Sequence, residues 1–118
     1  MSKAIAVVED DESIREMLRY YFQSVGYAVR AYESGEALFA GEEGLGLPAL
    51  YILDIMLPGM DGLELCQRVR ERYHDMSIIL LTGYADFEYA RRGIELQVTD
   101  YCLKPIDTEQ LTATLRRA

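Results

Sequence analysis

Short apolar runs of strand length alternate with segments of helical period along the whole chain. The first run, residues 4–8, is continuously apolar, which is typical of a strand buried on both faces. The run over residues 27–32 is interrupted by the charged Arg30, which favours a strand at the edge of a sheet. The predicted strands are residues 4–8, 27–32, 49–53, 77–81 and 101–103.

The segments between these runs carry signals for the ends of helices. Ser13 and Glu16 have the spacing of a capping box, and Gly26 is a natural stop for the helix that follows them. Ser34 is the predicted N-cap of a short second helix, and Asp107 is the predicted cap of the last one. The predicted helices are residues 13–25, 34–40, 61–73, 86–96 and 107 onward.

Strict alternation of strands and helices predicts an α/β fold, in which helices cover both faces of a parallel sheet. A chain of 118 residues suits one such unit, so we expect residues 1–118 to form a single domain. In sheets of this kind, ligands bind at the carboxyl ends of the strands, near the point where the strand order reverses. The carboxyl ends of the predicted strands are therefore the expected place of the functional side chains.

Composition narrows the class of partner. The formal net charge is −8, from 20 acidic and 12 basic residues, which argues against binding to nucleic acid or to an anionic membrane. The two cysteines, Cys66 and Cys102, have no Cys-x-x-Cys spacing and sit among apolar residues, so we expect buried thiols. No apolar run approaches the roughly 20 residues of a membrane span, and the N-terminus lacks the layout of a signal peptide. We therefore expect a cytoplasmic protein.

Polar side chains stand at the end of four of the predicted strands. The first strand is followed by three acidic residues, the third by an aspartate, the fourth by a threonine and the fifth by a lysine. These residues are Glu9, Asp10, Asp11, Asp54, Thr82 and Lys104. They are distant in sequence, but the predicted fold brings them to one edge of the sheet.

Each of these residue types has a role in phosphoryl transfer. Clustered carboxylates repel one another unless a cation neutralises them, and Mg²⁺ prefers such oxygen ligands. A carboxylate is also a nucleophile toward phosphorus, as Asp54 would be in forming an aspartyl phosphate. Lys104 and Thr82 supply a positive charge and a hydroxyl for the phosphoryl oxygens. No glycine-rich loop of the Walker type accompanies them.

Taken singly, these residues have simpler interpretations. Glu9 fits a solvated turn as well as it fits a ligand site. Asp11 can cap the first helix, although Ser13 already offers that cap. Thr82 alone is more often a turn hydroxyl than a ligand, and Lys104 alone is more often a surface lysine. Only their joint occurrence at the strand ends predicts a site.

At these positions the chain closely resembles the receiver domains of bacterial response regulators. Four segments carry the resemblance, and their order and spacing make it specific; the match covers essentially all 118 positions. The segments are residues 8–12 (Val-Glu-Asp-Asp-Glu), 53–62 (Leu-Asp-Ile-Met-Leu-Pro-Gly-Met-Asp-Gly), 81–83 (Leu-Thr-Gly) and 100–105 (Asp-Tyr-Cys-Leu-Lys-Pro). The resemblance implies a flavodoxin-like sheet of five strands in the order 2-1-3-4-5, flanked by five helices.

The resemblance also implies roles for single residues. It makes Asp54 the phosphoacceptor, and it makes Asp10 and Asp11 the acidic pair, with Asp11 as the direct ligand of Mg²⁺ and Asp10 as a direct or water-mediated one. The backbone carbonyl of Met56 would complete the metal site. The Lys104 ammonium would contact the phosphoryl group, and the bond from Lys104 to Pro105 would be cis.

By the same resemblance, Thr82 and Tyr101 form a switch pair. Phosphorylation draws the Thr82 hydroxyl to the phosphoryl group and lets Tyr101 turn inward, so that the face made by the fourth helix, fifth strand and fifth helix changes shape. The partners implied are a sensor histidine kinase or a phosphotransfer protein, an output domain or downstream protein, and a second copy of the domain on phosphorylation. The only chemistry expected is self-phosphorylation and self-dephosphorylation.

Residues 84–90 resemble receivers fused to helix-turn-helix outputs of the arabinose-regulator type, which suggests a transcription regulator. The chain stops just after the last predicted helix, where an output domain would begin, so an excised domain is expected.

Three other classes of protein compete with this interpretation. A haloacid-dehalogenase-like phosphohydrolase has an Asp-x-Asp pattern after its first strand, where this chain has Asp10, Asp11 and Glu12. A histidine phosphotransfer module is all-helical, whereas the only histidine here, His74, follows a predicted helix. A flavodoxin-type flavin binder needs a phosphate loop after its first strand, where the acidic residues would repel phosphate.

Overall fold

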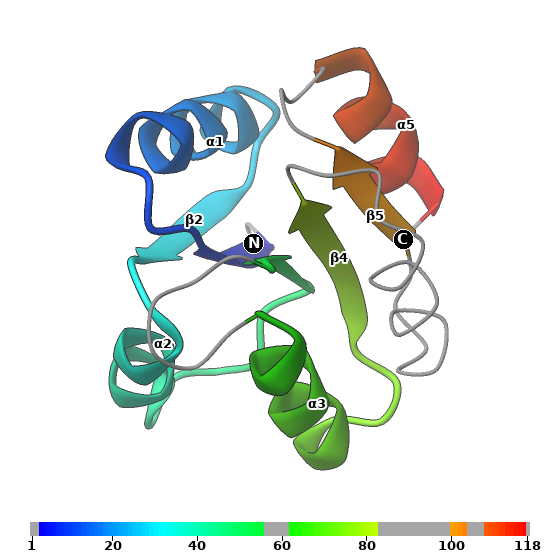
Figure 1. Ribbon diagram of the computed structural model, residues 1–118. Helices are drawn as coiled ribbons and strands as arrows, with labels where there is room; N and C mark the ends of the chain where they lie inside the picture. Colours follow the sequence, from blue (N-terminus) through cyan, green and yellow to red (C-terminus); the bar gives the residue numbers. More distant parts are fainter. Residues whose placement is uncertain (1–2, 56–61, 83–99, 104–107, 118) are drawn as a thin grey trace.

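A five-stranded parallel sheet runs through the middle of the molecule (Figure 1). The computed structural model describes residues 3–55, 62–82, 100–103 and 108–117. The strands lie in the order β2-β1-β3-β4-β5, so the predicted edge position of the second strand is confirmed. The strands are β1 (Ala4–Val8), β2 (Ala28–Tyr32), β3 (Leu50–Asp54), β4 (Ser77–Thr82) and β5 (Asp100–Leu103).

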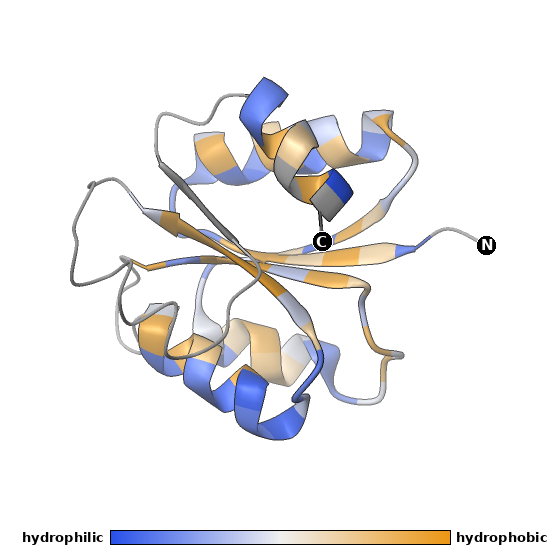
Figure 2. Ribbon diagram, turned by 90° about the vertical axis from the view of Figure 1, so that its right-hand side faces the viewer, coloured by the Kyte–Doolittle hydropathy of each residue, from blue (hydrophilic) through white to orange (hydrophobic). Residues whose placement is uncertain are grey.

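Helices cover both faces of this sheet, as the alternating pattern predicts. Figure 2 views the molecule along the sheet and shows α1 and α5 on one side of it and α2 and α3 on the other. The helix predicted over residues 86–96 lies outside the described residues, so four of the five predicted helices are described. They are α1 (Glu12–Ser24), α2 (Gly35–Glu42), α3 (Gly62–Arg72) and α5 (Thr108–Arg117).

Each face of the sheet has its own apolar core, because side chains alternate along a strand. Ile5, Val7 and Ile52 pack with Leu18 and Phe22 of α1. The alternate positions of the same strands, Ala6, Val8 and Leu53, pack on the opposite face with Leu65 and Val69 of α3. Figure 2 shows the apolar strands enclosed between helices whose outer sides are polar. Both cores hold the strands in a fixed register, which sets what stands at their ends.

The start of α1 differs from the prediction. Asp11 is the N-cap, and its carboxylate accepts a hydrogen bond of 3.0 Å from the Ile14 N–H, so the helix begins at Glu12. The predicted capping box of Ser13 and Glu16 is therefore wrong, because Ser13 already lies inside the first helical turn. The predicted cap of the second helix is confirmed, since the Ser34 hydroxyl accepts from the Ala37 N–H at 3.0 Å.

A partly buried ion pair joins the edge strand to α2. The Arg30 guanidinium in β2 lies 3.1 Å from the Glu42 carboxylate at the end of α2, and only 12 % of the Glu42 side chain is exposed. The Tyr32 hydroxyl donates to the same carboxylate, and Arg30 also donates to the Gly46 carbonyl at 2.9 Å. We call Arg30, Tyr32 and Glu42 the Arg30 cluster.

Two further features, the Cys66 thiol and the character of the helices, are also subjects of prediction. Cys66 is a free, buried thiol in α3, as predicted, and burial raises its pKa to about 11, so it is a poor nucleophile near neutral pH. Across the described stretches of chain, no helix combines the length and the apolar character needed to cross a membrane.

Candidate metal and phosphoacceptor site

The register of β1 and β3 brings two acidic side chains to the same place. Val7 lies opposite Ile52 in the parallel ladder, and both side chains belong to the core under α1. Two residues further on, the same face and register lead to Glu9 and Asp54. Glu9 continues the ladder beyond β1, since its N–H donates to the Tyr32 carbonyl at 3.0 Å. Period-two alternation therefore places both carboxylates at the carboxyl edge of the sheet.

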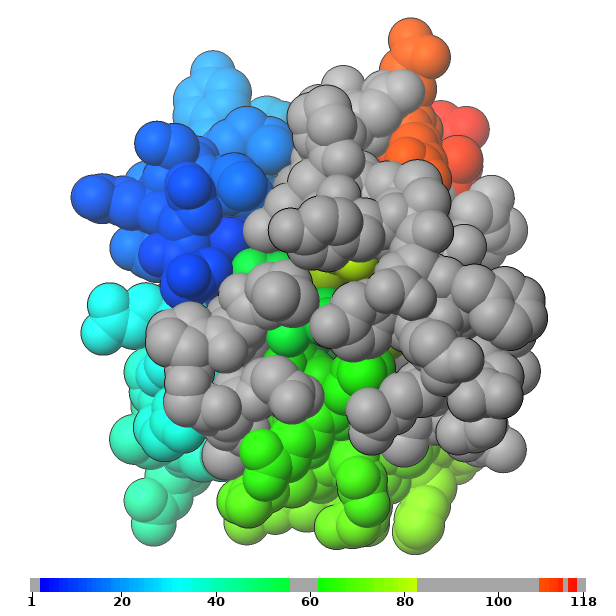
Figure 3. Space-filling model, viewed as in Figure 1, coloured from blue at the N-terminus to red at the C-terminus, as the bar shows by residue number. Residues whose placement is uncertain are grey.

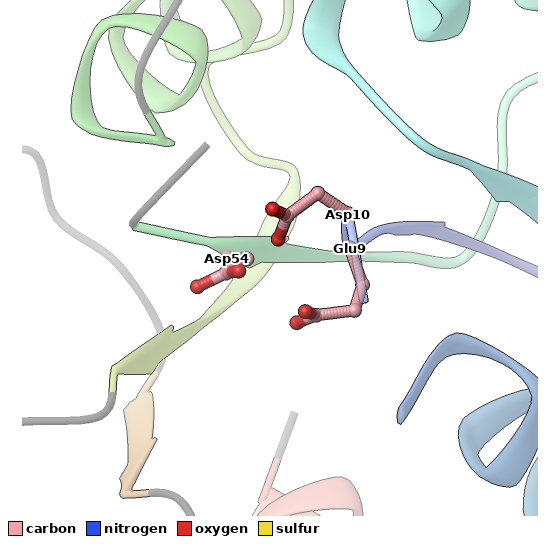
Figure 4. Close-up of side chains that lie close together, drawn as sticks. All are labelled: Glu9, Asp10 and Asp54. Atoms are coloured by element: carbon pink, nitrogen blue, oxygen red, sulfur yellow. The ribbon is translucent and has the colours of Figure 1, made fainter. Parts of the chain in front are cut away.

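A third carboxylate completes this group. Ligand oxygens of Glu9, Asp10 and Asp54 all lie within 4.8 Å of one another. Figure 4 shows the Glu9 and Asp10 side chains at the end of β1 and Asp54 at the end of β3, with their carboxylates gathered in one place. Glu9 is 0 % exposed and Asp54 1 %, whereas Asp10 is open to solvent. We call Glu9, Asp10 and Asp54 the acidic group.

The two acids that lie beside Asp54 are one position earlier in the sequence than the predicted pair, Asp10 and Asp11. The structure brings Glu9 and Asp10 to Asp54, while Asp11 is the helix cap described above. The Asp11 N–H donates to the Glu9 carboxylate at 3.1 Å, so Asp11 supports the group through its backbone. A metal-ligand role for the Asp11 side chain stays a prediction from resemblance that this geometry does not favour. Sequence reasoning left Glu9 undecided, although its spacing from Val7 is the signal that identifies it.

The backbone around Asp54 is fixed on both sides. Beyond Asp54, the Ile55 N–H donates to the Leu81 carbonyl at 2.9 Å, which prolongs the β3–β4 ladder past the aspartate. The Gly62 N–H at the start of α3 donates to the Ile55 carbonyl at 2.9 Å. A Cβ at Gly62 would lie 1.9 Å from the Asp54 carbonyl oxygen, so only glycine allows α3 to begin this close to the aspartate.

Of the other predicted site residues, Thr82 and Tyr101 lie in described strands. Thr82 is the last residue of β4, beside β3, and it is 2 % exposed. Tyr101 lies in β5 opposite Leu80 of β4. Met56 and Lys104, with the bond from Lys104 to Pro105, lie outside the described residues. Leu103, which precedes Lys104 in the chain, pairs with Thr82 in the β4–β5 ladder.

The chemistry of the acidic group fits a hard divalent cation. Three carboxylates with oxygens this close repel one another, and two of them are buried, where water screens that repulsion weakly. Mg²⁺ binds through a small number of carboxylates while it keeps several waters, and the exposed Asp10 leaves the group open to water on one side. The residues present therefore suit Mg²⁺ better than a soft metal, which prefers thiolate or imidazole.

A groove between α2 and α3 lies apart from the acidic group. Its lining includes Leu38, Phe39, Tyr51, Val69, Arg72 and Tyr73, and none of the predicted site residues. The Arg72 guanidinium lies 5.7 Å from the centre of the Phe39 ring. Burial, with a smaller effect from Glu42, raises the pKa of Tyr51 to about 12, so this phenol is a neutral packing group at physiological pH.

The surface near the carboxyl edge combines both helical layers. Figure 3 shows α1, in blue, and α2 and α3, in cyan and green, reaching the same side of the molecule. The acidic group lies between these layers because its strands, β1 and β3, are central in the sheet.

Fold and site together define a class: a doubly wound, flavodoxin-like α/β domain with a buried aspartate inside a cation-competent acidic group. Comparison with known families agrees with this class and identifies the family. Residues 5–116 match the response regulator receiver domain. The chain belongs to this family, whose members are signalling domains of two-component systems.

Solved structures of the family are close to this one over its whole length. A BeF3-activated DrrB receiver domain is 33 % identical, with a TM-score of 0.88, and the match covers 99 % of this chain and 97 % of that one. The Vibrio cholerae chemotaxis protein CheY4 is 28 % identical, with a TM-score of 0.91, over 99 % and 98 % of the two chains. A longer DrrB chain from Thermotoga maritima, described as an OmpR/PhoB homologue, is 32 % identical with a TM-score of 0.87; the match covers 99 % of this chain and 52 % of that one.

Proposed function

We propose that this domain is a phosphorylation-dependent switch that accepts a phosphoryl group on Asp54 with Mg²⁺ bound at the acidic group. The observation that carries the proposal is the convergence of the buried Asp54 with Glu9 and Asp10 at the carboxyl edge. A carboxylate that is held rigidly beside two others is both a metal ligand and a nucleophile, which is the combination that this chemistry needs.

In the proposed reaction, a carboxylate oxygen of Asp54 attacks the phosphorus of a phosphohistidine in a sensor kinase or phosphotransfer protein. The new P–O bond forms as the P–N bond of the donor breaks, and the histidine leaves with the electron pair of that bond. Glu9, Asp10, Asp54 and the carbonyl of Met56 would hold Mg²⁺, with Asp11 as an alternative ligand. When bound, the metal would offset the negative charge of the transferring oxygens. Lys104 and Thr82 would contact the same oxygens.

The readout proposed for this state is a change around Thr82 and Tyr101. A phosphoryl group at Asp54 adds acceptor oxygens within reach of the neighbouring strand end, so Thr82 can donate to it and the space beside Tyr101 changes. Phosphorylation then favours one of two pre-existing arrangements of the face that includes β5 and α5. Partners would read this face as an output domain, as a downstream protein or as a second copy of the domain.

We propose that the domain acts in the cytoplasm and that its output is transcriptional. The DrrB chain that resembles this one is about twice as long as the match and is described as an OmpR/PhoB homologue. We propose by analogy that this domain controls a linked output domain. The net charge of −8 makes direct contact of the domain itself with nucleic acid unfavourable.

The test is intact-mass spectrometry after incubation with acetyl phosphate, with and without Mg²⁺. The wild-type chain should gain about 80 Da, the mass of one phosphoryl group, only when Mg²⁺ is present. Asp54→Asn should gain nothing, and Asp75→Asn, which removes an exposed acid remote in sequence from the acidic group, should behave like the wild type.

Two outcomes would contradict the proposal. If the folded wild-type chain gains no mass, the domain is a docking module with the shape of a receiver. If acetyl phosphate is instead turned over many times without a stable adduct, the domain is a phosphohydrolase. BeF3⁻, added together with Mg²⁺, is a second probe, because a solved receiver domain similar to this one is described as BeF3-activated.

A further inference from the structure

A basic residue of α1 reaches back to the loop that carries the acidic group. Nη1 of Arg15 donates to the Glu9 carbonyl at 2.9 Å and lies 3.4 Å from the Asp10 carbonyl. These carbonyls belong to two of the three acidic residues. Arg15 is half-buried, and its contact with the Glu9 carbonyl is partly shielded from water, while its contact with the Asp10 carbonyl is exposed.

Arg15 contacts backbone carbonyls and not the carboxylates, so the carboxylate oxygens are not taken up by its guanidinium. An arginine paired with the carboxylates would compete with a metal for the same oxygens. Arg15 instead places a fixed positive charge behind the loop and leaves the carboxylate oxygens directed to the other acids. The charge offsets part of the repulsion within the acidic group without occupying the site.

Arg15 also completes the restraint of this loop. The Glu9 N–H is bound to β2, the Asp11 N–H is bound to the Glu9 carboxylate, and the Asp11 side chain caps α1. These bonds leave the Glu9 and Asp10 carbonyls for Arg15. With both carbonyls held, the peptide planes at Glu9 and Asp10 are oriented, and so are the directions in which their side chains leave the backbone.

We propose that Arg15 is a positioning residue for the metal site: it holds the Glu9 and Asp10 carbonyls so that their carboxylates meet Asp54 at a distance that suits a divalent cation. The inference rests on the proposed function, since it assigns Arg15 a part in binding the metal of that same site. Arg15 touches neither the metal nor the phosphoryl group, so its effect is on affinity for the metal.

The experiment compares Mg²⁺ binding by Arg15→Ala, Arg15→Gln and Arg15→Lys with that of the wild type. Arg15→Ala should weaken Mg²⁺ binding about tenfold, as the loss of a residue that orients metal ligands does. The yield of phosphorylated protein from acetyl phosphate should recover when Mg²⁺ is raised to saturation. Arg15→Lys should restore much of the affinity, because an ammonium retains the charge and donates to a carbonyl, while Arg15→Gln retains a donor only.

Arg19→Ala is the matched control. Arg19 lies one turn further along α1, and its partner is the exposed Glu16 at 3.4 Å. Its replacement should leave Mg²⁺ affinity unchanged. Hydrogen exchange in metal-free protein gives a second readout: the amides of residues 9–11 should exchange faster in Arg15→Ala, while those of β1 keep their protection.

The outcomes separate this inference from the proposed function. If Arg15→Ala is less stable but binds Mg²⁺ as the wild type does, Arg15 is only a structural residue and the inference fails alone. If the wild-type chain itself binds no Mg²⁺, the proposed function fails and the inference fails with it. If Arg19→Ala weakens Mg²⁺ binding as much as Arg15→Ala, the effect is the net charge of α1, which also overturns the inference.

Discussion

Two sites that hold acidic side chains, the Arg30 cluster and the acidic group, are built in opposite ways. In the Arg30 cluster, the Glu42 carboxylate has a guanidinium at 3.1 Å and a phenol as hydrogen-bond donors from its own chain. In the acidic group, Glu9, Asp10 and Asp54 meet one another within 4.8 Å, and Arg15 contacts only the backbone behind them. The first arrangement pairs one acid with a base and a hydroxyl, while the second brings three acids together in a geometry that suits a divalent cation. Burial of an acid alone therefore does not identify a functional site; its nearest neighbours do.

The largest expected effect is at the glycine that lets α3 begin beside the acidic group. In Gly62→Ala, the new Cβ would meet the Asp54 carbonyl oxygen at 1.9 Å, so the backbone of β3 or of α3 must move. We expect a loss of about 3 kcal/mol in the free energy of unfolding, together with weaker Mg²⁺ binding. Urea unfolding and Mg²⁺ titration measure the two effects.

Gly46→Ala is the control for this variant, because a Cβ at Gly46 has nothing within 4 Å and the backbone there is not left-handed. It should change the free energy of unfolding by less than about 0.5 kcal/mol. Equal losses in the two variants would mean that the close approach at Gly62 does not constrain Asp54.

The Arg30 cluster should respond strongly to the loss of its acid. In Glu42→Ala, the Arg30 guanidinium, whose side chain is only 21 % exposed, loses its counter-charge, and Tyr32 loses its acceptor. We expect a loss of about 2 kcal/mol in the free energy of unfolding, with Mg²⁺ binding unchanged. Glu64→Ala removes the acid of an exposed pair with Arg68 and should cost no more than about 0.5 kcal/mol.

How far the sequence predicts the molecule follows from the same contrast. The apolar runs predict the strands of the sheet, and the resemblance in four short segments predicts the strand order. Both predictions succeed because they need only local sequence patterns. The cap of α1 was mispredicted because Asp11 and Ser13 are both good caps. The choice depends on the Glu9 carboxylate, which accepts the Asp11 N–H and so decides where the chain turns. The Glu9 backbone is itself held by a hydrogen bond from its N–H to the Tyr32 carbonyl of β2, a pairing between segments that the local sequence does not specify.

A pH effect should mark the region around the Arg30 cluster. Burial raises the pKa of Tyr51 to about 12, whereas the phenol titrates near 10 in the unfolded chain. The unfolded state thus loses this proton first, and the stability that the neutral phenol contributes is present below about pH 10 and is lost as the pH rises toward 12.

Tyr51→Phe should therefore remove about 1 kcal/mol of the fall in unfolding free energy between about pH 9 and pH 11. Urea titrations at the two pH values measure it. Tyr20→Phe, at a residue that is 78 % exposed, should leave the fall unchanged. An identical fall in Tyr51→Phe and the wild type would show that the Tyr51 phenol ionises freely in the folded protein.

The smallest expected effect is a gain in stability where the other variants lose it. It tests most directly whether the acidic group differs from the Arg30 cluster. Glu9→Gln keeps the shape of the side chain and an oxygen that can accept the Asp11 N–H, but it removes one of three clustered negative charges. Without metal, the variant should be more stable than the wild type by about 1 kcal/mol, because less repulsion remains in the folded state. With Mg²⁺, the order should reverse, because the wild type gains more from binding the cation. Thermal unfolding with and without Mg²⁺ measures both. If Glu9→Gln is less stable than the wild type without metal, the fold already compensates the Glu9 charge, and the acidic group is then built like the Arg30 cluster and not as a place for an added cation.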